Sequence, residues 1–286
     1  MRRASGMRGA AFALCAAALS VPTLVRGETK ADDRIKDTAE FSYVVTAGNS
    51  ETDTLGFKDK LWRKWERSSF EINAGGVRAE STTIVRTASG TQTDYTIRKD
   101  ETTAVTAQNY FANGRYDRKI TDRFFWFVGT GWDRNTFAGI QNRYTGVGGV
   151  GNTWIDAERV KFRTDYSVTY TNEKDVVDNP NFKANFSGLR VSSNFMHKIG
   201  ATSAFNNDLV LDENLDDTSD FRANMISSLT ATMNARLALK VSLQWLYDHQ
   251  PAFVAVDLLN SAPPVKVLAQ LDDLDTIFTA SLVLNF

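Results

Sequence analysis

The residue types that most often carry catalysis are scarce in this chain of 286 residues, which contains two histidines and one cysteine. A hydrolase needs a nucleophile activated by a nearby base, which is commonly a histidine. His197 and His249 fall at predicted strand ends on opposite sides of the fold derived below, and neither lies beside a serine motif. Cys15 lies inside the apolar N-terminal run, so the rest of the chain has no thiol nucleophile and no thiolate metal site. The sequence therefore predicts no enzyme chemistry and no catalytic residue.

Two further stretches carry residue types that could bind a ligand. Residues 146–151 read GVGGVG, which formally matches a dinucleotide fingerprint, but that fingerprint needs a helix after it and here another strand pattern follows. The stretch DENLDDTSD gathers five acids, namely Asp212, Glu213, Asp216, Asp217 and Asp220. Calcium favours such oxygen clusters, but the glycine of a calcium loop is missing and the spacing is irregular. We interpret the first stretch as a glycine-rich strand and the second as a solvated external loop, and we expect no cofactor and no metal.

The elements that position these residues show a period of two, while helical periodicity is nearly absent. In residues 160–170 the apolar residues Val160, Phe162, Tyr166, Val168 and Tyr170 share one face, and polar residues occupy the other. Residues 236–248 repeat this alternation. Alternation of this kind is typical of strands that have one apolar and one polar face.

Counting the alternating segments gives about twelve strands, an even number of the kind that bacterial barrels show. The expected strands are residues 39–48, 53–64, 67–88, 92–118, 122–135, 141–154, 158–172, 181–197, 202–212, 219–232, 235–248 and 273–286. Short connections alternate with longer ones, of which 249–272 is the longest. Outer-membrane barrels have short periplasmic turns and longer external loops. The sequence therefore predicts an all-β fold, a single antiparallel up-and-down transmembrane β-barrel with both chain ends on the periplasmic side.

A soluble sandwich would bury the apolar faces in a core, whereas a membrane barrel turns them toward lipid. The membrane barrel is favoured by an export signal without disulfides, by aromatic residues near strand ends and by a final strand that runs to Phe286. The aromatic residues expected in interfacial girdles are Trp62, Trp65, Tyr116, Trp126, Trp132, Trp154, Trp245, Tyr247 and Phe286. The closing strand must pair with the first so that no edge faces hydrocarbon. We expect Phe286 to act as the C-terminal insertion signal.

The N-terminus has the basic, apolar and then polar order of a secretory signal peptide. We predict a signal peptide over residues 1–27, a periplasmic lead-in over 28–38 and the barrel over 39–286. The signal holds four of the 33 basic residues and none of the 34 acids, which leaves 29 basic and 34 acidic residues and a net charge of -5. This balance disfavours a nucleic-acid partner.

The polar strand faces carry the ionic residues, and a charge facing lipid at the midplane costs about 2–4 kcal/mol. We therefore expect these side chains to line the lumen. The predicted lumen-lining residues are Lys58, Lys60, Glu71, Asn73, Lys161, Arg163, Asp165, Arg190, Lys240 and Gln244. They could form a salt-bridged plug or a narrow, charge-selective water-filled pore.

Several short stretches resemble a known family. They are GNSET at 48–52, TDRFF at 121–125, Asp133, FAGI at 137–140, Arg143 and the glycine run from Gly146 to Gly151. With them, residues 39–286 resemble the salt-induced outer membrane protein family, whose domain has no known function. The resemblance implies an outer-membrane barrel and transfers no catalytic residue. In this chain Asn152 replaces the aromatic residue that usually follows the last glycine in that family.

Three functions stay open at this stage: a structural barrel related to envelope or salt stress, a narrow small-solute channel and an outer-membrane lipid hydrolase. Each of them places the protein in the outer membrane of a Gram-negative-type envelope. The expected partners are outer-membrane lipid and lipopolysaccharide, periplasmic chaperones and the barrel-assembly machinery.

Overall fold

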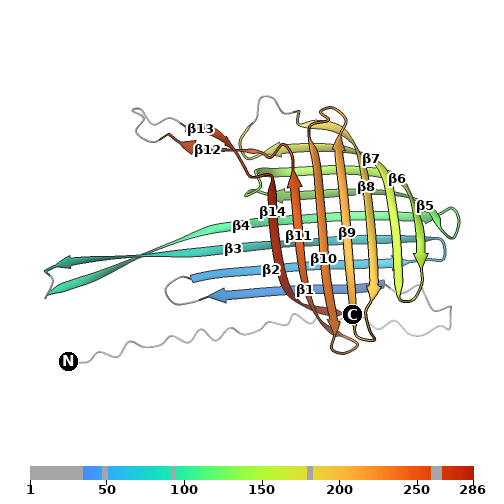
Figure 1. The fold of residues 1–286 in the computed structure, drawn as a ribbon, viewed down its shortest axis with the longest axis horizontal. Coiled ribbons are helices and arrows are strands. Elements are labelled where there is room, and N and C mark those ends of the chain that lie inside the picture. Colours follow the sequence, from blue (N-terminus) through green and yellow to red (C-terminus); the bar gives the residue numbers. More distant parts are fainter. Residues whose placement is uncertain (1–34, 47–50, 92–93, 179–182, 259–265) are drawn as a thin grey trace. The chain divides into compact units, whose positions relative to one another are not determined.

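The strands of this protein close into one antiparallel barrel (Figure 1). The computed structural model describes residues 35–46, 51–91, 94–178, 183–258 and 266–286. Within them, neighbouring strands pair in chain order from β1 to β11, and β14 pairs with both β11 and β1. Strands β12 and β13 form a separate hairpin. The predicted fold class, an up-and-down barrel of twelve strands, is confirmed.

The observed strands follow the predicted ones closely. Their bounds are β1 (Ile35–Thr46), β2 (Glu51–Lys64), β3 (Ser68–Gly90), β4 (Tyr95–Lys119), β5 (Phe124–Asn135), β6 (Ile140–Asp156), β7 (Val160–Asp175), β8 (Asn185–Lys198), β9 (Ser203–Asn214), β10 (Phe221–Thr232), β11 (Leu237–Asp248), β12 (Phe253–Asp257), β13 (Lys266–Gln270) and β14 (Leu274–Asn285). Among the described residues, no helix is long and apolar enough to cross a membrane.

The connections fall into two sets at opposite rims. Five short turns join β2–β3, β4–β5, β6–β7, β8–β9 and β10–β11, and backbone hydrogen bonds close each of them, as from Trp65 N to Ser68 O (2.8 Å). We call this end, where β1 begins and β14 ends, the short-turn rim. The other end, which carries the longer connections β7–β8, β9–β10 and β11–β14, is the loop rim. From the β6–β7 turn onward short and longer connections alternate as the sequence predicts, whereas the β5–β6 turn at the loop rim is as short as the turns of the opposite rim.

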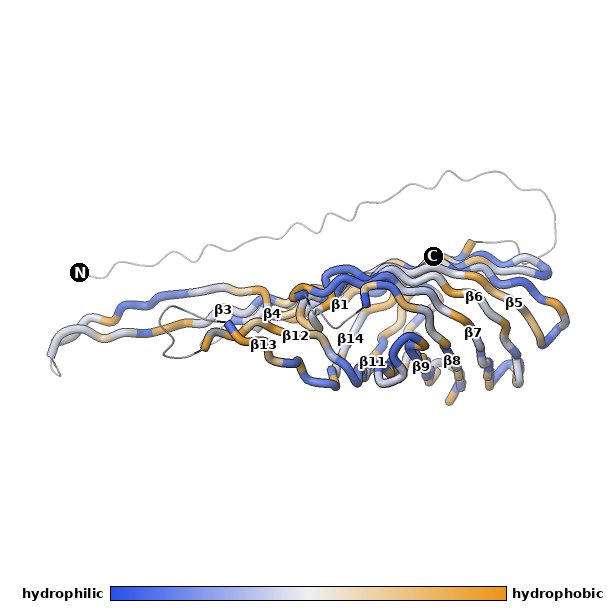
Figure 2. The backbone as a smooth tube through the Cα atoms, turned by 90° about the horizontal axis from the view of Figure 1, so that it is seen from above, coloured by the Kyte–Doolittle hydropathy of each residue, from blue (hydrophilic) through white to orange (hydrophobic). Residues whose placement is uncertain are grey.

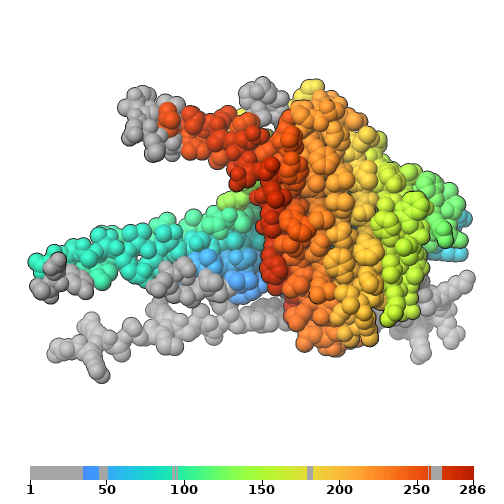
Figure 3. Space-filling model, viewed as in Figure 1, coloured from blue at the N-terminus to red at the C-terminus, as the bar shows by residue number. Residues whose placement is uncertain are grey.

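Two hairpins extend beyond the barrel at the loop rim (Figures 1 and 3). Strands β3 and β4 pair with each other from Ser68 to Gly90, but β2 accompanies β3 only to Thr82 and β5 accompanies β4 only from Asn109. The outer part of this hairpin is therefore a two-stranded ribbon with both edges free of barrel strands. The second hairpin, β12–β13, lies inside the connection over residues 249–272, which alternation predicts as one long loop.

The apolar side chains face outward, the reverse of a soluble core. On β7, Tyr166, Val168 and Tyr170 are 49–61% exposed, while the alternating Asp165, Ser167 and Thr169 are buried. The short set of buried hydrophobic residues, which includes Phe125, Phe127 and Phe186, lies on the inner faces. Figure 2 shows the alternation of hydrophilic and hydrophobic residues along the strands. An apolar outer wall around a polar interior is the arrangement of transmembrane barrels.

The structure corrects the predicted start of the barrel. Strand β1 begins at Ile35 rather than at residue 39, because the ladder with β2 continues through Lys36↔Trp62. Residues 35–38, which the sequence assigns to the end of the lead-in, therefore belong to the wall. Their polarity resembles that of a linker, but an inner barrel face is polar as well. The predicted signal peptide over 1–27 and the lead-in up to residue 34 lie outside the described residues.

One predicted girdle residue faces the interior instead. By strand alternation Trp62 lies on the same face of β2 as Lys60, and its ring packs under the Lys36 ammonium at 5.3 Å. Phe41 and Phe57 occupy the opposite face of β1 and β2, where their rings contact at a tilt with centroids 5.2 Å apart. A girdle assignment based on closeness to a strand end cannot distinguish these two faces, and only the phase of the strand does.

The barrel closes through a short seam. Four residue pairs, from Thr38↔Asn285 to Phe41↔Leu282, join β1 to β14. The Thr38 hydroxyl donates to Asn285 Oδ1 at 3.3 Å, and the Phe286 amide donates to Asp37 O at 3.0 Å. The last strand thus pairs with the first, as the closed-barrel prediction requires.

Candidate functional site

The candidate site is the lumen, because the inner strand faces gather most of the ion pairs. By strand alternation, all ten predicted lumen-lining residues lie on faces opposite the exposed apolar side chains. They come from five strands: Lys58 and Lys60 on β2, Glu71 and Asn73 on β3, Lys161, Arg163 and Asp165 on β7, Arg190 on β8, and Lys240 and Gln244 on β11. The structure places seven of them in two polar groups, and a third polar group contains none of them.

The first group lies on the wall made by β1, β2, β3 and β11. Lys60 Nζ lies 2.7 Å from Glu71 Oε2, and the Asn73 amide donates to Glu71 Oε1 at 2.6 Å. Lys240 Nζ reaches across β14 to Glu40 Oε1 at 2.8 Å. The sixth member, Lys58, has no ion-pair partner among the described residues, and the charges that act on it most strongly are those of Lys240 and Glu40. An amine that makes no direct ion pair within the described chain faces the interior here.

The second group is a quartet of two arginines and two aspartates on β4 and β7. Arg115 contacts Asp117 and Asp165, both at 2.7 Å. Arg163 contacts the same two carboxylates at 3.4 and 3.1 Å. The quartet thus links strands that β5 and β6 separate. Each guanidinium meets two carboxylates, so the quartet is neutral in total.

Aromatic rings and glycines on β5 and β6 make room for this quartet. The Arg115 guanidinium lies 3.7 Å from the centre of the Phe127 ring, and the Arg163 guanidinium lies 4.5 Å from that of Phe125. A Cβ atom on Gly151 would collide with the Phe125 ring and would lie 2.5 Å from Asp165 Oδ1. The glycine run therefore allows a large ring to lie flat on the wall, with an arginine above it. This agrees with the expected role as a strand that permits close approach.

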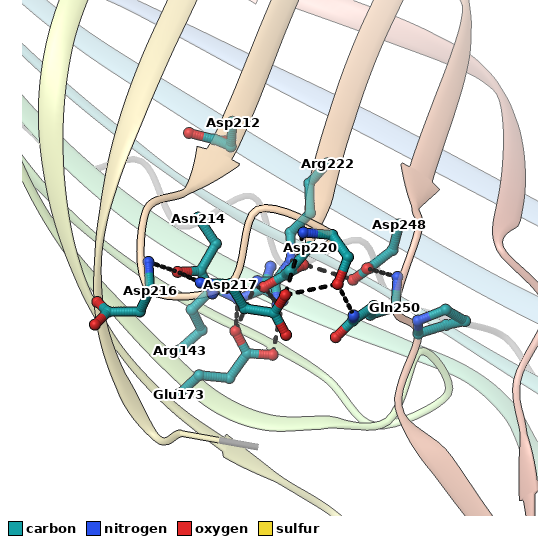
Figure 4. A network of polar contacts seen from close by, with 12 residues as sticks. Arg143, Glu173, Asp212, Asn214, Asp216, Asp217, Asp220, Arg222, Asp248 and Gln250 are labelled. Carbon is teal, nitrogen blue, oxygen red and sulfur yellow. Dashed lines mark hydrogen bonds and ion pairs between the residues drawn. The ribbon is translucent and has the colours of Figure 1, made fainter. Parts of the chain in front are cut away.

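The third group lies at the loop rim and is shown in Figure 4. We call it the mouth cluster. Glu173 on β7 accepts two hydrogen bonds from Arg143, at 2.7 and 2.9 Å, and one from Arg222 at 2.8 Å. Arg222 also contacts Asp220 at 2.9 Å and Asp248 at 3.4 Å. Both Glu173 and Asp220 have side chains less than 5% exposed. These buried charges are therefore held in one hydrogen-bonded network.

The loop between β9 and β10 supplies part of this cluster. The Asn214 side chain donates to Asp220 Oδ2 at 3.0 Å and accepts from the Asp216 amide at 2.9 Å. Hydrogen bonds from the hydroxyl and the amide of Ser219 hold the pKa of Asp217, which lies in this loop, below its usual value. The loop is thus folded on its own polar groups. The expectation that its acids are simply solvated is wrong for Asp220.

The remaining predicted residues form pairs outside the three groups. Arg190 makes a two-contact pair with Asp212 at 2.6 and 3.0 Å, and the Gln244 amide donates to Asn224 at 2.9 Å. Lys161 contacts Asp156 at 3.3 Å near the short-turn rim, with both side chains more than half exposed. Lys161 therefore lies at the rim rather than deep in the lumen.

Sequence reasoning missed several inward-facing residues. Arg115, Asp117, Arg143, Glu173 and Arg222 lie on the inward phase of their own strands, so alternation could have found them. Phe186 could not be found in that way, because an aromatic residue on the polar face of β8 resembles a change of phase. The structure instead keeps a regular β7–β8 register and places the Phe186 ring 5.4 Å from the Arg222 guanidinium.

The groups considered for catalysis remain apart. His197 lies near the end of β8 at the short-turn rim, and His249 follows β11 at the loop rim. The His249 ring shares a 3.0 Å hydrogen bond with the Tyr247 hydroxyl. Within the described ranges there is no group of three or more histidine, cysteine, aspartate or glutamate side chains arranged to hold a metal ion.

Comparison with known proteins finds one family and several similar folds. A family model described as "Protein of unknown function, DUF481" matches residues 39–259. A search of curated protein sequences finds no match. The solved NanC porin has 10% identity and a TM-score of 0.47 over 88% of this chain and 98% of that chain. An anion-selective porin from Comamonas acidovorans has 9% identity and a TM-score of 0.38 over 89% and 100%. Similarity at this level concerns the chain fold alone.

Proposed function

We propose that this chain, which belongs to the family described as "Protein of unknown function, DUF481", is an outer-membrane barrel with a narrow, water-filled pore for small hydrophilic solutes. Membership in that family brings no activity with it, so the support comes from the lumen of this chain. The observation that carries this proposal is the exposure of inward-facing charges. Lys60 and Glu71 are 46% and 31% exposed although their strands turn apolar side chains outward. Their exposed surface therefore faces solvent inside the barrel.

The arrangement of the ion pairs supports an open lumen over a plug. Lys60–Glu71 and Arg190–Asp212 join neighbouring strands, and Arg115–Asp117 lies along one strand. Pairs of this kind follow the wall and leave the centre free. The quartet on β4 and β7 and the Arg222–Glu173 contact of the mouth cluster each bridge two intervening strands, so these two groups project further and narrow the passage. Barrels of eight strands are filled by side chains and those of about sixteen hold channels, and twelve lies between them.

The outer wall supports the location in a membrane. Leu239, Val241 and Leu282 are 40–52% exposed on neighbouring strands. In water these apolar side chains would have no packing partner. Facing lipid, they need none. A signal peptide, periplasmic chaperones, the barrel-assembly machinery and contact with outer-membrane lipid and lipopolysaccharide follow as proposals from this location. A role in the envelope response to salt is supported by the family resemblance, and protein abundance after a shift to high salt tests it.

Thiol labelling tests the water-filled lumen, because the only cysteine, Cys15, lies in the predicted signal peptide. Asn73 and Ile72 are neighbours on β3 with side chains on opposite faces. In liposomes, Asn73→Cys should react rapidly with a charged, water-soluble methanethiosulfonate, and Ile72→Cys should react slowly. Equal protection of the two thiols would refute a wet lumen.

Planar-bilayer recording tests conduction directly. The refolded protein should give stepwise currents, and Asn73→Trp should reduce the current per step while Ile72→Trp leaves it unchanged. Folding of each variant is checked by its heat-dependent mobility on a gel. A folded protein without measurable current would overturn the pore and leave a structural barrel.

A further inference from the structure

The mouth cluster forms one side of a cavity whose other lining residues belong to none of the three polar groups. The cavity has a volume of about 260 Å³ and lies between the ends of β7 and β11, the start of β10 and the segment that follows β11. The charged and amide side chains that line it are Glu173, Asp175, Arg222, Asp248, Gln250 and Gln270. Phe253 and four small or aliphatic residues complete the lining.

The roof of this cavity is formed by residues 250–253 and Gln270, which belong to the β11–β14 connection. Contacts within this connection, and with the β5–β6 and β7–β8 connections, hold the roof in place. The Leu271 amide donates to Ala252 O at 3.0 Å, and the Gln270 side chain donates to Pro251 O at 3.5 Å. Gly139, at a φ of +78°, brings the β5–β6 turn so close that a Cβ atom there would collide with Ala252. Its carbonyl in turn accepts a 2.8 Å hydrogen bond from the Val176 amide. The roof is thus joined to the wall.

The charges around the cavity do not balance. Two guanidiniums, Arg143 and Arg222, already face four carboxylates, those of Asp133, Glu173, Asp220 and Asp248. Asp175 adds a fifth carboxylate. The five acids and two bases leave an excess of three negative charges.

Among these five carboxylates, Asp175 is the one that makes no ion pair within the described part of the chain. Its Oδ1 atom is buried and accepts no hydrogen bond within the described part of the chain. The charged groups that act on it are Glu173, Arg143, Arg222 and Asp248, and both arginines are already paired with other acids. A buried acceptor without a donor costs about 1–3 kcal/mol. A cation that enters the cavity and compensates the charge of the Asp175 carboxylate would offset part of that cost, although the buried Oδ1 atom itself is not accessible.

We infer that this cavity binds a small organic cation with a primary ammonium group, which donates to Asp175 and Asp248 while its carbon chain packs beside Phe253. The amide oxygens of Gln250 and Gln270 can accept further hydrogen bonds, and an aromatic face attracts a nearby cation. A divalent metal fits less well, because the described residues contain no three-acid group with metal-binding geometry. The inference rests on the proposed pore, because in that pore this cavity would be the first binding site for a solute that enters from the loop rim.

Binding can be measured without any current, which separates this inference from the pore itself. The refolded full chain in detergent is titrated with n-butylammonium at pH 7, with 1-butanol and butyrate as the neutral and anionic analogues. Butylammonium should bind, and the two analogues should bind at least tenfold more weakly. Binding of 1-butanol equal to that of butylammonium would overturn the inference.

Substitutions then locate the site. Asp175→Asn should weaken butylammonium binding at least fivefold, whereas Asp156→Asn, the same charge change at the exposed short-turn rim, should not alter it. Ala138→Leu fills the cavity without changing a charge and should also abolish binding, so the test does not depend on one variant. Unchanged affinity in folded Asp175→Asn and Ala138→Leu proteins would refute the site. A protein that binds butylammonium but carries no current would instead refute the pore and keep the site.

Discussion

Replacement of Glu173 by glutamine tests whether the mouth cluster stabilises the barrel. Glu173 is the centre of this cluster, with three hydrogen bonds of 2.7–2.9 Å from two arginines and a side chain only 4% exposed. Glutamine keeps the shape of the side chain but removes the charge and points amide hydrogens toward the guanidiniums. Arg143 would keep only Asp133, at 3.9 Å, whereas Arg222 would keep Asp220 at 2.9 Å.

The magnitude follows from what each arginine retains. Removal of one member of a buried ion pair costs about 3–5 kcal/mol, because the partner stays buried without a counter-charge. Arg222 retains a close carboxylate and Arg143 does not, so the lower end applies. We expect Glu173→Gln to lower the free energy of unfolding by about 3 kcal/mol.

The assay is urea-induced unfolding from phospholipid vesicles, followed by tryptophan fluorescence. Glu158→Gln is the matched control, since Glu158 is 90% exposed and lies 3.6 Å from Lys198. Exposed pairs of this kind contribute about 0–1 kcal/mol, so the control should unfold like the parent. A loss below about 1 kcal/mol in Glu173→Gln would show that lumen water screens the cluster, and would refute the reasoning.

Three further changes follow from the wall and its contents. Gly151→Val should lower the free energy of unfolding by about 1–3 kcal/mol, because the new side chain overlaps the Phe125 ring. Gly146→Val is the control and should have little effect, because the nearest atom there is 4.0 Å away. Equal losses in the two variants would contradict this packing. Lys58→Glu should shift the reversal potential in a KCl gradient toward cation selectivity more than Lys161→Glu at the rim does, and no shift would place Lys58 off the conduction path. Replacing residues 84–101 by a short turn should leave folding and current unchanged, because barrel strands pair only with the base of that hairpin; loss of the barrel would contradict this.

Period-two alternation predicted the fold and the inward faces because both depend on one local property. A charge that faces lipid costs about 2–4 kcal/mol, so the phase of each strand is forced wherever it carries ionic residues. Lys60, Arg163 and Lys240 were assigned to the interior in this way, from their own strands alone. Trp62 shows the limit, because an amphipathic ring is compatible with either face and sequence position did not decide between them.

The partners of these residues could not be predicted, because a partner depends on the register of every strand between. Arg115 and Asp165 meet across β5 and β6, so their contact depends on three successive strand pairings and on the short turns between them. Bulges add to this uncertainty: the register shifts between Thr153 and Ile155 at one end of β6 and between Ile140 and Asn142 at the other. Alternation gives the face on which a residue lies, whereas the sum of turn lengths and bulges gives its position along the barrel axis, which we call its height.

Height decides which charges can govern a passing solute. Fields of exposed charges decay over about 8–10 Å at physiological salt, so a close pair such as Arg190–Asp212 has little influence beyond its own wall. Groups that make no ion pair are less compensated, and the inner wall of the described strands carries such groups of both signs, among them Asp175 at the loop rim and Lys58 on β2. In the proposed pore, a solute that enters from the loop rim would therefore meet a carboxylate before it meets an amine. Selection by charge would then come from a few unpaired groups in sequence, and the more numerous ion pairs would shape the passage.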